Sequence, residues 1–84
     1  MVIKNQDKDN LNRAFGAALR QRREKCSLSQ ENLGFESGYH RTYISLLERG
    51  LKAPSLTAIF NLAKALNVNP SDLIHEVESQ LPPK

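Results

Sequence analysis

The residues of this 84-residue chain whose types could do chemistry together lie between two glycines, Gly38 and Gly50. Side chains suited to contact a base edge occur there on one predicted helix face: His40, Arg41, Thr42, Ser45 and Leu46. A guanidinium such as that of Arg41 can donate to guanine O6 and N7 together, and a threonine can donate to a base or press its methyl against thymine. Leu46 can make only an apolar contact, such as one with a thymine methyl. These residues predict a surface that reads the major groove of double-stranded DNA.

The other reactive residues form no catalytic or metal-binding pattern. Cys26 is the single cysteine, so no internal disulfide can form, and a lone thiol fits a reducing compartment. His40 and His75 are 35 positions apart and make no zinc pattern. The serines fall at predicted helix caps or on the base-reading helix, so no Ser/His/Asp arrangement can be argued. We therefore expect no enzyme, cofactor, metal or small-molecule ligand.

Five helices in one compact bundle are expected to position these residues, which makes the fold all-α. Residues 1–10 are mostly polar and lack periodicity, so they predict a flexible arm, with Asp9 or Asn10 capping the first helix. That helix should end near Lys25 or Cys26. The domain is then expected over residues 11–79, and apolar residues recur three and four apart in its first helix: Leu11, Phe15, Ala18 and Leu19.

A pair of short helices around Gly38 forms the expected helix-turn-helix, residues 29–49. Ser29 is suited to cap the first of the two, and Gly38 supplies the positive φ of a tight turn. The second helix covers residues 41–49, and its inward or partly buried residues should be Ile44, Leu47 and Tyr43. The alternative is an exposed polar helix pair in a bundle, which has the same spacing.

Two further helices complete the bundle. The fourth begins at Leu56 and is apolar on more than one face, so its apolar residues are expected in the core: Leu56, Ile59, Phe60, Leu62, Ala63 and Leu66. Asn69 and Pro70 start the fifth helix, residues 70–79. We expect that helix to form a dimer interface through its apolar residues, namely Leu73, Ile74, Val77 and Leu81. The alternative is that these residues only complete the core of one protomer.

Ordered motifs at fixed spacing lie between residues 28 and 68, within a resemblance that covers roughly residues 12–75. They are Leu28-Ser29-Gln30-Glu31-Asn32-Leu33, Gly38, Tyr43-Ile44-Ser45, Glu48-Arg49-Gly50, Pro54-Ser55-Leu56 and Ala63-Lys64-Ala65-Leu66-Asn67-Val68. Together they resemble the XRE/Cro-repressor family of bacterial and phage regulators, which implies a five-helix, lambda-repressor-like DNA-binding domain. Within that family, residues 40–45 and the small size look most like the controller proteins of restriction–modification systems.

The resemblance also implies individual roles. Contacts to the DNA backbone fall to residues around the base-reading helix: Gln30, Tyr43, Arg49, Lys52 and Ser55. Arg23 and Glu48 match a pair that forms a salt bridge between the first and third helices. His40 stands where a Ser or Thr cap is usual, so a phosphate or base contact is expected to explain it. Gly34 replaces a usual Ala, which should cost about 1 kcal/mol of helix stability, and Ser27 replaces a usual Gly.

Charge and composition predict the partners. The net charge is +3, and ten of the twelve Lys and Arg lie in residues 1–52, which suits a polyanion on one face. No apolar stretch has the length of a membrane span and no signal peptide is evident, so we expect a soluble, cytoplasmic protein. We expect a homodimeric transcription regulator on a short palindromic operator, with RNA polymerase a candidate further partner. The alternative class is an antitoxin-like protein whose main partner is a toxin, bound by residues 1–10 or 76–84.

Overall fold

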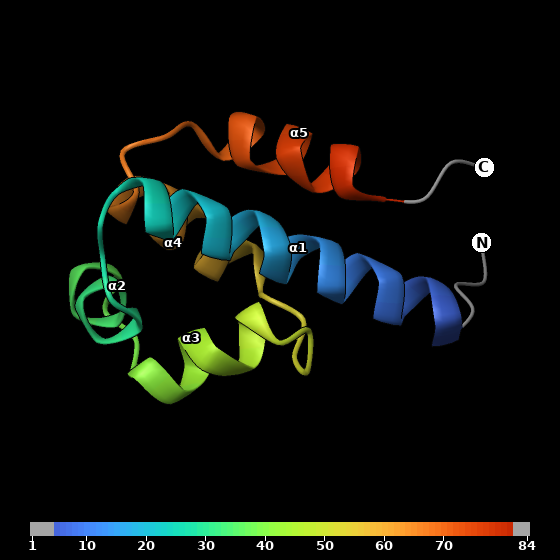
Figure 1. Cartoon of the computed structure of the whole chain (residues 1–84), viewed down its shortest axis with the longest axis horizontal. Helices are drawn as coiled ribbons and strands as arrows, with labels where there is room; N and C mark the ends of the chain where they lie inside the picture. Colours follow the sequence, from blue (N-terminus) through green and yellow to red (C-terminus); the bar gives the residue numbers. More distant parts are fainter. Residues whose placement is uncertain (1–4, 82–84) are drawn as a thin grey trace.

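The computed structural model describes residues 5–81, and the side chains of residues 7–81. This part of the chain contains helices and no strand, which confirms the all-α expectation. Figure 1 shows the five helices in chain order, and their bounds are α1 Asn5–Lys25, α2 Gln30–Ser37, α3 Arg41–Glu48, α4 Leu56–Ala65 and α5 Pro70–Gln80. The long α1 lies between α5 and α3, and α2 packs against both α3 and α4.

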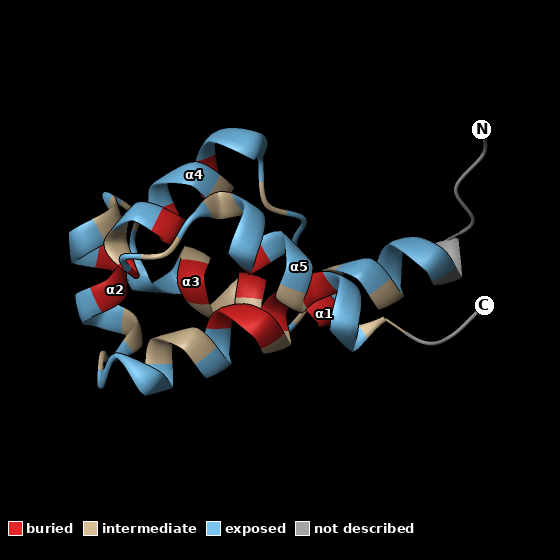
Figure 2. Ribbon diagram, turned by 90° about the horizontal axis from the view of Figure 1, so that it is seen from above, coloured by how far each residue is buried: buried red, intermediate tan, exposed pale blue. Residues whose placement is uncertain are grey.

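The first helix begins earlier than its apolar pattern predicts. Residues 5–10 belong to α1, so the expected arm over residues 1–10 is wrong there, and residues 1–4 lie outside the described part. No glycine or proline interrupts the chain before Gly16, and Asp7 places a negative charge in the first turn, where the helix dipole favours it. These turns project beyond the bundle with an exposed surface (Figure 2), so local propensity rather than packing supports them.

The ends of the helices follow the predicted start and stop signals. Ser29 and Ser55 are the N-caps of α2 and α4, and each hydroxyl oxygen accepts a backbone N–H bond of 3.0 Å, from Asn32 and Ala58. Gly38 (φ 83°) ends α2 in the left-handed region, as predicted. Ser27 takes the same region after α1, at φ 56°, where the family pattern has glycine.

The core gathers apolar residues from all five helices (Figure 2). Two expected core residues are instead exposed, Leu56 at 70% and Phe60 at 55%, and Leu11 of the predicted apolar stripe is 46% accessible. The reason for α4 is that the bundle covers only one side of it, and that side is filled by Ala58, Leu62 and Ala63. An apolar pattern on more than one face therefore overestimated how much of this helix is covered.

Candidate nucleic-acid interface

The base-reading residues predicted on α3 lie on its outer side. Ile44 and Leu47 are fully buried and hold the helix on the core. Arg41 and Thr42 are exposed, and Ser45 and Leu46 are half-buried. Arg41, Thr42 and Ser45 line one shallow, open hollow together with Gln30 from α2. Three of the predicted base-reading residues thus share a surface with a predicted backbone contact.

His40 has a structural role that the sequence did not indicate. It is the N-cap of α3, and its Nδ1 accepts a 3.0 Å hydrogen bond from the backbone N–H of Thr42. An imidazole here therefore replaces the usual Ser or Thr by performing the same capping function. A phosphate or base contact is not needed to explain this residue.

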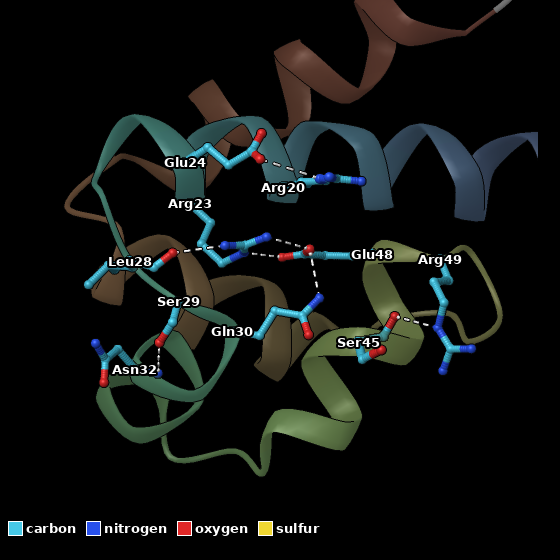
Figure 3. A network of polar contacts seen from close by, with 10 residues as sticks. All are labelled: Arg20, Arg23, Glu24, Leu28, Ser29, Gln30, Asn32, Ser45, Glu48 and Arg49. Atoms are coloured by element: carbon cyan, nitrogen blue, oxygen red, sulfur yellow. Dashed lines mark hydrogen bonds and ion pairs between the residues drawn. The ribbon is translucent and has the colours of Figure 1, made fainter.

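The C-terminal end of α3 is tied to α1 and α2 through Glu48 (Figure 3). Arg23 donates from Nε to one carboxylate oxygen (2.6 Å) and from Nη2 to the other (3.0 Å), in the bidentate geometry that makes such pairs strong. Gln30 Nε2 donates to the second oxygen as well (3.1 Å), and Arg23 Nη1 donates to the Leu28 carbonyl (2.8 Å). The expected salt bridge is present, and Gln30 braces the same carboxylate.

Burial strengthens this network. The side chains of Arg23 and Glu48 are only 12% and 4% accessible, so little water competes with their hydrogen bonds. The hydrogen bond to Glu48 raises the pKa of the Arg23 guanidinium above its ordinary value, against the opposing effect of desolvation. Because the pKa of Arg23 is raised on folding, the stability that this shift contributes is complete below the ordinary arginine pKa and is lost only as the pH rises through the folded-state pKa. The guanidinium therefore stays charged at neutral pH.

The other predicted backbone contacts lie on α3 and in the segment that follows it. Lys52 is exposed, and its Nζ lies 5.5 Å from the centroid of the half-buried Tyr43 ring. Arg49 is also exposed, with Nε 3.4 Å from the Ser45 carbonyl oxygen. Within residues 7–81, neither Arg49, Lys52 nor Arg41 forms an ion pair, so their charges face solvent. Ser55 uses its hydroxyl oxygen to cap α4, which leaves the hydroxyl proton to donate.

The four residues predicted for a dimer interface are buried to different degrees. Leu73 and Val77 are 0% and 4% accessible inside the protomer, which favours the alternative that these two residues complete its core. Leu81 is half-buried and packs on the same core. Ile74 alone of the four is exposed, at 39%. It lines an apolar hollow together with Val77 and with two residues outside the predicted interface, Leu11 of α1 and Ile59 of α4.

A metal-binding group and a membrane-spanning helix are both absent from the described residues. No group of three His, Cys, Asp or Glu side chains there could hold a metal ion. No helix within residues 5–81 combines the length and the apolar character that crossing a membrane requires.

Comparison with known proteins decides the family. The family model described as "Helix-turn-helix" matches residues 19–73, which run from the last part of α1 through α2, α3 and α4 to the first turn of α5. The chain belongs to this helix-turn-helix family. Its members are DNA-binding transcription regulators rather than enzymes, and the XRE/Cro resemblance is confirmed.

The relatives of this helix-turn-helix chain include controller proteins. The control protein C.BamHI of Bacillus amyloliquefaciens is 48% identical over 67 residues, which cover 79% of this chain and 83% of that protein. The crystal structure of the restriction-modification controller protein C.AhdI from Aeromonas hydrophila is 44% identical, with a TM-score of 0.72, over 74% of this chain and 94% of that one. The crystal structure of the clp gene regulator ClgR from C. glutamicum is 30% identical, with a TM-score of 0.82, and the match covers 88% of this chain and 96% of that one.

Proposed function

We propose that this protein is a sequence-specific, double-stranded DNA-binding transcription regulator of the controller type found with restriction–modification systems. The observation that carries the proposal is α3, whose exposed Arg41 and Thr42 are presented by a helix held at Glu48 by Arg23 and Gln30. A helix of this kind fits the major groove with its N-terminal side chains at base edges. The similarity to C.BamHI and C.AhdI supports the controller subtype.

The residues around α3 divide into two roles. Arg41, Thr42 and Ser45 read base edges, and Leu46 contacts them only through apolar atoms. The DNA backbone is bound by Gln30 on α2 and by a set on α3 and in the segment that follows it: Tyr43, Arg49, Lys52 and Ser55. Phosphate contacts set the register of the protein on the duplex, and base contacts set its preference. His40 contributes through the cap that starts α3.

The protein acts on DNA as a homodimer. One helix-turn-helix covers only a few base pairs, whereas a two-fold dimer presents two recognition helices about 34 Å apart and so binds a palindromic operator. We place the contact with the second copy at Ile74 and the neighbouring Leu11 and Ile59, which line an apolar hollow at the surface. Occupancy of the operator then depends on protein concentration through the monomer–dimer equilibrium.

RNA polymerase is the further partner that we propose. Phe35 on α2 is 85% accessible, and the exposed acids Glu31 and Glu36 lie on the same helix, which carries no basic residue. An exposed aromatic side chain beside acids suits a basic protein surface, and a regulator bound near a promoter meets the polymerase. In transcription from a purified template, Phe35→Ala should lower regulated transcription without changing operator binding. Unchanged transcription would contradict this partner.

Binding of Arg41→Ala and Lys52→Ala to operator variants tests the proposal. The operator is first selected by the wild-type protein from a random DNA pool. Arg41→Ala should relax preference at one base position and cost about 1–3 kcal/mol at the correct base. Lys52→Ala should weaken binding to all sequences equally and reduce the slope of log K against log salt by about 1 for each protomer. Equal, sequence-independent losses from both variants would refute base reading by Arg41.

A further inference from the structure

Tyr39, in the turn between α2 and α3, touches side chains from two other elements and has no role in the function proposed so far. Its hydroxyl oxygen accepts a 3.0 Å hydrogen bond from Nδ2 of Asn61 on α4. Its ring centroid lies 4.9 Å from that of Tyr43 on α3, with the two planes tilted by 41°, an arrangement that aromatic pairs favour. Tyr43 in turn has the Lys52 ammonium near its ring. These four residues form a continuous line of contacts, here called the aromatic row.

The backbone of Tyr39 is also held tightly. Its N–H donates to the Gly34 carbonyl oxygen at 2.7 Å. A Cβ built on Gly34 would lie 2.4 Å from the Tyr39 carbonyl oxygen, so only glycine lets the turn lie directly on α2. This explains Gly34 in a position where the family pattern has alanine. Gly34 fixes the backbone of Tyr39 and Asn61 fixes its hydroxyl, so the ring between them has little freedom.

The aromatic row ends at Lys52, whose conformational freedom affects how tightly it can bind a phosphate. A lysine side chain samples many rotamers, and ordering it on a phosphate costs entropy. A cation within about 6 Å of a ring centroid is attracted to the ring face, so Tyr43 partly orders Lys52 before DNA is bound. The Tyr43 ring can do this only when its own rotation is restricted. Tyr39 is the aromatic neighbour that packs against it.

We infer that Tyr39 is a positioning residue for binding of the DNA backbone: it holds the Tyr43 ring in the orientation on which Lys52 rests. The inference rests on the proposed function, in which Lys52 binds phosphate. Because phosphate contacts carry no sequence information, Tyr39 sets affinity and salt dependence and leaves base preference unchanged.

The contact between Tyr43 and Lys52 is tested first in the free protein by NMR. The Tyr43 ring current moves the Lys52 ε-methylene protons upfield, and Tyr43→Leu should remove this shift. Tyr39→Leu should reduce it, whereas the matched control Phe35→Leu, which removes an exposed aromatic outside the row, should leave it unchanged. Thermal unfolding first establishes that each variant is folded. A folded Tyr39→Leu protein with the wild-type Lys52 shift overturns the inference, and this readout requires no DNA.

DNA binding is then measured for Tyr39→Leu, Lys52→Ala and the double variant. Tyr39→Leu should weaken binding about three-fold per protomer, hence about ten-fold for a dimer, on the operator and on unrelated DNA alike. It should add almost nothing once Lys52 is alanine, and Tyr39→Phe, which keeps the ring, should restore most of the affinity. Fully additive effects in the double variant overturn the inference. A wild-type protein that binds no DNA overturns the proposed function. The NMR result then still tests whether Tyr39 orients the Tyr43 ring against Lys52.

Discussion

The backbone of α1 at Gly16 lies directly against the carbonyl group of Leu47 in α3: a Cβ built on Gly16 would stand 2.4 Å from that oxygen. It would also lie 2.5 Å from the Glu48 carbonyl oxygen. The Glu48 carboxylate accepts hydrogen bonds from Arg23, which lies about two turns further along α1 than Gly16. The close approach at Gly16 and the ion pair at Arg23 therefore fix the same end of α3 on the same helix.

Gly16→Ala should destabilise the protein even though alanine is the better helix former. In an open helix the change gains about 1 kcal/mol, but the added methyl meets backbone atoms that cannot rotate away, which costs about 1–3 kcal/mol or more. Urea unfolding measures the net sign. Ala17→Gly, one residue along α1, is the control for helix propensity and should lose about 1 kcal/mol. A Gly16→Ala protein more stable than wild type would show that α1 and α3 separate at no cost.

Removing one partner of the Arg23–Glu48 pair should be strongly destabilising. Glu48→Ala leaves the guanidinium, which is 12% accessible, without its carboxylate, and loss of one member of a buried pair costs about 3 kcal/mol. The double variant Arg23→Met, Glu48→Leu should be less destabilised than the sum of the single variants, because neither buried charge is then left alone. Urea unfolding of the wild type, Arg23→Met, Glu48→Leu and the double variant gives the coupling energy between the two side chains. Additive losses would mean that the two side chains do not stabilise each other.

The role of His40 as a cap predicts which substitutions α3 tolerates. His40→Ala should cost about 1 kcal/mol of unfolding free energy, because the Thr42 N–H loses its acceptor. His40→Ser should retain stability, since serine accepts the same bond. Operator selection with His40→Ser should return the wild-type sequence. A changed preference at one base position would instead give His40 the direct contact expected from the sequence.

The proposed dimer contact predicts that Ile74→Asp shifts the protein to monomers. Ile74 is 39% accessible in the protomer, so the fold should tolerate the charge while an apolar contact between copies should not. Sedimentation across a concentration range measures the association, and operator binding should weaken in parallel. Phe35→Asp, at another exposed apolar position, is the matched control and should leave association unchanged. If Ile74→Asp dimerises with the same affinity as the wild type, the interface lies elsewhere.

Local signals in the sequence predicted most of the secondary structure. Ser29, Gly38 and Pro70 act through their own backbone or nearest neighbours, and each lies at the helix end that its chemistry predicts. No apolar stripe marks the helical start at Asn5, although nothing in residues 5–9 opposes a helix.

The distribution of apolar residues between core and surface was predicted less well. Hydrophobicity alone does not distinguish the buried Leu73 and Val77 from the exposed Leu56 and Phe60. Periodicity indicates which side chains share a helix face. It does not indicate whether another helix of the same chain covers that face.

The sequence by itself determined the helix-turn-helix and the chemical types of the residues on its second helix, because caps, turns and periodicity act over a few neighbouring residues. Only the tertiary structure decided how those residues are held. Arg23 and Glu48 are 25 positions apart, and only the family resemblance predicted their pairing. The contact of Tyr39 with Asn61, 22 positions apart, and that of Gly16 with Leu47 arise only from the packing of the helices. Such pairs form when several helices pack at once around one core, and no local pattern contains that information.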